Sequence, residues 1–148
     1  MPAADPLRRL VAALESSLAM YVSDSGIWSY PGPEEIKLAL ADLVGDHKSL
    51  LDRAGTVLAE REVAAPRTAY PLSFTALHDL DLKSLLPRLI HALDAQAAAC
   101  ESVAAVAGDD TTAVELAREA VQTNRRHGEQ LRQLLAKSRA GLVDAKPL

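Results

Sequence analysis

The chain has little cysteine, few aromatic residues and few β-branched residues, and each shortage narrows what it can be. Its single cysteine, Cys100, excludes an internal disulfide and a zinc site built from cysteines. Aromatic residues make up 3% of the 148 residues, while hydrophobic residues make up 49% and are mainly alanine and leucine. Both have high helix propensity, and β-branched residues are too sparse for a large sheet. The composition and length therefore predict one all-α domain spanning 1–148.

The chain also lacks a basic stripe and a long apolar run. Its formal net charge is −4 at pH 7, with arginines and acids interspersed, so we expect no nucleic-acid partner. No uncharged apolar run reaches the roughly 18 residues that a membrane span needs. The apolar N-terminal segment is interrupted by Glu15 and two serines, which favours an amphipathic helix over a signal peptide. We therefore expect no membrane association and a cytoplasmic location.

Apolar residues recur at helical spacing through most of the chain. Acidic and proline residues mark the expected helix starts, such as Asp5-Pro6, Pro33, Asp81 and Asp110. The pattern predicts helices at 6–24, 33–62, 82–107 and 110–140, a link at 63–81, and a frayed tail at 141–148. Four amphipathic helices of this kind are typical of a four-helix bundle.

The link from 63 to 81 decides the topology of this bundle. Fully extended it reaches about 60 Å, whereas a 26-residue helix is about 39 Å long. It can thus cross the whole bundle and make the second and third helices parallel, or fold back and give an up-down-up-down bundle. The apolar residues Tyr70, Leu72, Phe74 and Leu77 suggest that it packs along the helices. We therefore favour the long crossover.

Polar residues interrupt the apolar stripes near the middle of the helices. His47 lies about 21 Å from the start of its helix, and His127 lies about 24 Å from the start of the last helix. With Asp94 and Glu15 they could hold a first-row transition metal, because imidazole and carboxylate groups both suit such ions. Alternatively, His47, Asn124 and Asp94 form a buried hydrogen-bonded cluster that fixes the helix register.

The segments Val44-Gly-Asp-His47 and Asn124-Arg-Arg-His127, together with the long link, resemble the ferritin-like superfamily. The di-iron site of that family uses Glu-x-x-His on two helices and a glutamate on each of the other two. Both histidines are present here, but Val44 and Asn124 stand at the glutamate positions. The resemblance implies a ferritin-like fold with a long crossover, and the lost carboxylates argue against ferroxidase activity.

A second resemblance is to DinB-like bundles with a three-histidine metal site. It would add either His78 or His91 to the two mid-helix histidines. His78 and Asp79 could also form a catalytic pair, although Asp79 or Asp81 can instead cap the following helix.

These observations favour a non-catalytic structural or protein-interaction module. No catalytic triad, phosphate-binding loop or nucleotide motif is visible, so we do not expect an enzyme or a cofactor. Long alanine-rich helices suggest self-association, with a homodimer favoured. The alternative is a metal-binding protein, ferritin-like or DinB-like, that uses His47 and His127.

Overall fold

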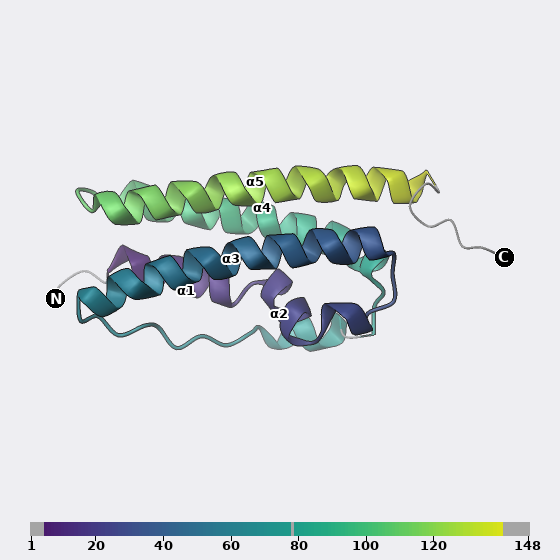
Figure 1. Ribbon diagram of the computed structural model, residues 1–148, viewed down its shortest axis with the longest axis horizontal. Helices are drawn as coiled ribbons and strands as arrows, with labels where there is room; N and C mark the ends of the chain where they lie inside the picture. Colours follow the sequence, from purple (N-terminus) through teal and green to yellow (C-terminus); the bar gives the residue numbers. More distant parts are fainter. Residues whose placement is uncertain (1–4, 78, 141–148) are drawn as a thin grey trace.

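The computed structural model describes residues 5–77 and 79–140 (Figure 1). These residues form helices and connecting segments and contain no strand, which confirms the all-α prediction. The tail 141–148, expected to fray, lies outside them. The helices are α1 (Pro6–Glu15), α2 (Leu18–Asp24), α3 (Glu34–Glu60), α4 (Leu82–Val106) and α5 (Thr111–Arg139), with two short 3₁₀ helices, η1 (Ile27–Ser29) and η2 (Leu72–Leu77).

The first helix is broken, whereas the sequence predicted one helix over 6–24. The Ser16 hydroxyl donates to the carbonyl of Ala12 (2.6 Å), and the Ser17 hydroxyl caps α2 by accepting from the Met20 backbone N–H (3.2 Å). Serine side chains compete with helical hydrogen bonds in this way. The adjacent serines therefore end α1 and start α2, and the last carbonyls of α1 are left without helical partners.

The other helices begin and end within two residues of their predicted bounds. Asp81 caps α4 by accepting from the Ser84 N–H (2.7 Å), and Asp110 caps α5 by accepting from the Ala113 N–H (3.1 Å). Pro87, which could have delayed the start of α4, is instead contained within the helix. Asp81 therefore serves as the cap that the sequence suggested.

Contacts at the helix ends set the direction of each helix. Arg61, at the C-terminal end of α3, bonds Asp5 (2.9 Å) and Asp110 (2.8 Å), which precede α1 and α5. Thus α3 runs antiparallel to both. At the other end, the Leu82 N–H donates to the carbonyl of Pro31 (2.8 Å), so α3 and α4 start side by side and run in the same direction (Figure 1).

The link therefore runs the length of the helices before α4 begins, as the long teal segment of Figure 1 shows. It comprises residues 61–81 and not 63–81, because α3 ends at Glu60. It is extended in its first part and contains η2 in its second.

The aromatic residues of the link hold it against the helices. The rings of Tyr70 and Phe74 lie 5.3 and 5.5 Å from the ring of Tyr21 on α2, centroid to centroid. With Leu77 they pack against the apolar core. Leu72 was expected to pack in the same way, but its side chain is 87% exposed. Phe74 and Leu77, in the same 3₁₀ helix, are partly buried.

A glycine permits the close contact at the end of the link. Gly32 has φ +154°, and a Cβ at this position would lie 2.8 Å from the Cβ of Leu82. Only glycine fits both the backbone conformation and the space. This contact brings the start of α4 against the loop that precedes α3.

Two apolar clusters fill the space between the helices. The α2-side cluster includes Ile36, Leu40, Leu43, Leu82, Leu86 and Leu131, and the α1-side cluster includes Leu7, Leu10, Leu14, Leu50, Leu58 and Cys100. Each joins one half of α3, α4 and α5 to either α2 or α1. The polar residues described next lie between them along the sequence of each long helix.

Candidate functional site

One chain of hydrogen bonds, buried except at its partly buried α1 end, joins α1, α3, α4 and α5. His47 Nε2 lies 2.6 Å from Asn124 Oδ1, and Asn124 Nδ2 donates to Gln96 Oε1 at 2.6 Å. Gln96 Nε2 then donates to the carbonyl of Ala13 at 2.8 Å. That carbonyl lies in the last turn of α1, where the helix offers it no partner. We call these four residues the buried network.

The direction of these bonds fixes the state of His47. Since Asn124 donates through its nitrogen to Gln96, its oxygen faces His47 and accepts from the imidazole Nε2–H. His47 has no exposed surface, and burial lowers its pKa below the ordinary value of 6.5, against the opposing effect of the Asn124 bond. The imidazole is therefore neutral at pH 7. Its buried Nδ1 has no hydrogen-bond partner within the described part of the chain.

A second pair lies beside the buried network, between the same two helices. His127 Nε2 on α5 lies 2.6 Å from Asp46 Oδ2 on α3, and an Arg126 nitrogen donates to the same oxygen at 2.8 Å. The bond to His127 lowers the pKa of the Asp46 carboxyl, and Arg126 adds to this effect. Two successive residues of α3, Asp46 and His47, are thus each paired with α5.

The four predicted metal ligands do not converge. His47 and His127 are bonded to Asn124 and Asp46, as described above. Glu15 accepts from the Thr68 hydroxyl of the link (2.9 Å), and Asp94 pairs with Arg132 on the surface (2.6 Å). Across residues 5–77 and 79–140, no group of three or more histidine, cysteine or acidic side chains is arranged to hold a metal ion.

The predicted polar cluster is correct in one pair and wrong in one residue. The structure brings His47 and Asn124 together, but Asp94 is half exposed and Gln96 takes its place. Gln96 follows Leu93 by three residues and precedes Cys100 by four, so the helical spacing itself could have identified it. For Asp46, the partner of His127, we find no comparable signal in the sequence.

The remaining histidines add nothing to this site. His91 is exposed on α4. His78, named as a third metal ligand or as a catalytic partner of Asp79, lies outside the described residues.

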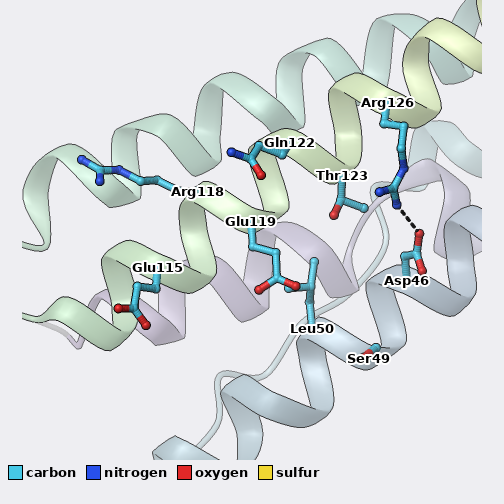
Figure 2. Close-up of a pocket in the computed structure, with 9 residues that line it drawn as sticks. All are labelled: Asp46, Ser49, Leu50, Glu115, Arg118, Glu119, Gln122, Thr123 and Arg126. Atoms are coloured by element: carbon cyan, nitrogen blue, oxygen red, sulfur yellow. Dashed lines mark hydrogen bonds and ion pairs between the residues drawn. The ribbon is translucent and has the colours of Figure 1, made fainter.

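An open groove of about 600 Å³ lies between α3 and α5, next to these pairs (Figure 2). Two ion pairs lie at the groove, Arg126 with Asp46 at 2.8 Å and Arg53 with Glu119 at 2.7 Å. The labelled side chains come from both helices. The groove therefore offers a polar surface of charged, amide and hydroxyl side chains.

No family model matches the chain, and neither does any curated protein or solved structure. Among the helices that the structure describes, none is long and apolar enough to cross a membrane.

Proposed function

We propose that the chain is a ferritin-like four-helix bundle that acts as a non-catalytic structural or protein-interaction module and associates as a homodimer. One observation carries this proposal: the buried network occupies the middle of the helices, where ferritin-like proteins carry their metal ligands. Two of the positions that would coordinate iron, His47 and Asn124, here bond each other.

The chemistry of these residues supports a structural role. An iron site needs oxygen-rich ligands, but Val44 and Asn124 stand where the family has glutamates. The Nε2 atoms of His47 and His127 are both engaged, in hydrogen bonds of 2.6 Å. Metal ligation through these atoms would break both bonds and leave Asn124 with an unpaired buried oxygen, at a cost of about 1–3 kcal/mol. The residues present therefore do not fit a di-iron centre.

The path of the chain supports the ferritin-like assignment. Residues 61–81 pass from the C-terminal end of α3 to the N-terminal end of α4, so these two helices are parallel. One long crossover of this kind distinguishes ferritin-like bundles from up-down-up-down bundles.

Exposed apolar side chains support an interaction role. Trp28, the single tryptophan of the chain, is 58% exposed, and Leu38 is 51% exposed. Tryptophan is enriched at the energetic centres of protein interfaces. Since the net charge is −4 and no basic surface stands out in the sequence, we expect a protein partner, with a second copy as the simplest, and a cytoplasmic location.

Metal analysis of the purified protein tests the non-catalytic part of the proposal. We expect no stoichiometric metal, and an unchanged melting temperature after treatment with a chelator. Stoichiometric iron, zinc or manganese that disappears in both His47→Ala and His127→Ala would overturn the proposal in favour of the metal-binding alternative. Exposed His91→Ala is the matched control, because it removes an imidazole outside the site.

Sedimentation velocity at micromolar concentration tests the self-association. A dimer is expected. A monomer at every concentration up to about 100 µM would refute this part, because a dissociation constant above that value is far weaker than that of a stable homodimer.

A further inference from the structure

The outward side of α3 carries an exposed stripe whose residues lie opposite His47. We call it the outer α3 face: Leu38, Ala41, Asp42, Gly45, Lys48 and Ser49, all exposed. At 100° per residue, all six lie within about 60° of Gly45 around the helix axis. The buried residues of α3 project from the other side. The outer α3 face is therefore a continuous surface without a partner in the described chain.

A shallow groove with a fixed tryptophan borders this face. The groove has a volume of about 320 Å³ and is lined by Trp28, Val44, Gly45 and Lys48 among others. The ammonium group of Lys37 donates to the Trp28 carbonyl at 3.0 Å and lies 5.9 Å from the ring centroid. Trp28 is thus exposed and also held in place. An aromatic side chain of this kind loses little conformational entropy on binding.

The middle of the face permits close approach of another helix. Ala41, Gly45 and Ser49 are small residues spaced four apart, so they form one line along the helix. A Cβ added to Gly45 would meet nothing within 4 Å. The backbone of a second helix can therefore lie directly against Gly45.

The charges on the face identify the partner. Asp42 and Lys48 are placed three residues before and three residues after Gly45, and neither has a hydrogen bond or ion pair with any described residue. If a second α3 crosses Gly45 in the antiparallel sense, Asp42 of each copy comes level with Lys48 of the other. Because these residues lie about 60° to either side of Gly45, they meet when the two helices cross at an angle. Such self-complementarity is the property of a two-fold interface. It gives two equivalent ion pairs, each between Asp42 of one copy and Lys48 of the other.

We propose that the outer α3 face is the dimer interface, in which two copies of α3 pack antiparallel about a two-fold axis at Gly45. The inference rests on the self-association proposed above and names its surface. Ala41, Gly45 and Ser49 set the close helix contact, Asp42 and Lys48 fix the antiparallel direction, and Trp28 packs at the edge.

Bulk at the centre of the face tests the close contact. Gly45→Gln should raise the dimer dissociation constant about tenfold or more, because the new side chain separates the two helices. Gly55→Gln is the matched control. Gly55 lies on the same helix, and an added Cβ there would also meet nothing within 4 Å. It is about 15 Å from Gly45 along the helix axis and about 80° from it around the axis. Both changes raise helix propensity equally, so circular dichroism should show both variants folded, and Gly55→Gln should dimerise like the wild type.

A charge exchange tests the two-fold pairing. Asp42→Lys and Lys48→Asp should each weaken the dimer about three- to tenfold, because each places like charges together. The double variant restores opposite charges and should return to within about twofold of the wild type at low salt. Sedimentation equilibrium of the four proteins measures all these values.

The outcomes separate this inference from the self-association itself. A wild-type monomer overturns both. A wild-type dimer that Gly45→Gln leaves unchanged overturns the surface alone and places the interface elsewhere. A dimer weakened by Gly45→Gln but not rescued in the charge double variant overturns the antiparallel two-fold arrangement.

Discussion

The polar residues on the two sides of α3, near the middle of the helix, differ in whether they have partners. On the inner side, His47 and Asp46 are bonded to α5, and the buried network continues from there to α4 and α1. On the outer side, Asp42 and Lys48 have no partner among the described residues. The inner side uses its polar groups to hold the helices together, whereas the outer side carries the charges that we propose pair with a second copy.

The largest effect should come from breaking the inner side at its centre. Asn124→Leu removes the acceptor of His47 and the donor to Gln96, so two buried polar groups lose their partners. We expect the free energy of unfolding to fall by about 2–4 kcal/mol. Urea denaturation measures it. Arg125→Leu changes the next residue, whose ion pair with Glu101 is exposed, and should cost less than about 1 kcal/mol. Equal losses for the two variants would contradict the role of the network.

A smaller loss should follow from cutting the network at its far end. Gln96→Leu removes the donor to the Ala13 carbonyl and the acceptor of Asn124. We expect a loss of about 1–3 kcal/mol, because the Ala13 end is only partly buried. The exposed Gln122→Leu is the control and should have little effect. If Gln96→Leu is as stable as the control, the bond between α4 and α1 does not stabilise the fold.

A third effect is the dependence of stability on pH. The pKa of His47 is lowered in the folded chain, so near its unfolded value of 6.5 the unfolded chain binds a proton that the folded chain does not. Stability is thus full above pH 6.5 and falls as the pH drops below it, by at most about 1.4 kcal/mol per pH unit. Asp46, whose pKa is lowered from 3.8, contributes only below that range.

Denaturation between pH 7.5 and 5 tests this dependence. His47→Gln, which can still donate to Asn124, should flatten the profile, while exposed His91→Gln should leave it steep. A wild-type profile that is already flat over this range would show that His47 is not held neutral.

The smallest effect on folding should come from the outer side. Asp42→Ala and Lys48→Ala remove exposed groups without partners, so each should change the stability of the monomer by less than about 0.5 kcal/mol. The free energy of unfolding should be measured at protein concentrations below the dimer dissociation constant, so that it reports the stability of the monomer alone. A loss above about 1 kcal/mol would mean that these charges already serve the monomer.

Most helix ends could be predicted from the sequence because they depend on local chemistry. Asp81 and Asp110 cap the helices that they precede, as their position before apolar periodic segments suggests. The break at Ser16-Ser17 was missed, because serine is tolerated within helices and ends one only when its hydroxyl bonds the backbone. The exposure of Leu72 was missed because an irregular link lacks the regular spacing that predicts which side chains of a helix face inward.

The site shows the limit of helical periodicity. His47 and Asn124 both fall on predicted inner stripes, so their meeting could be anticipated. Asp94 and Gln96 differ by two positions, which is about 200° around a helix, and only one of them can face inward. The sequence pattern does not determine which of the two faces inward, because the rotation of each helix about its axis is set by packing against its three neighbours.

The reach of the buried network along the chain has a consequence for how the protein assembles. The helices α4 and α5 are adjacent in sequence and pack more extensively than any other pair. The Gln96–Ala13 bond, by contrast, joins positions 83 residues apart. Contacts between distant positions form late in folding, after the cost of closing the intervening chain is met. We therefore expect α4 and α5 to pair first and α1 to dock last, so that losing this bond speeds unfolding more than it slows folding.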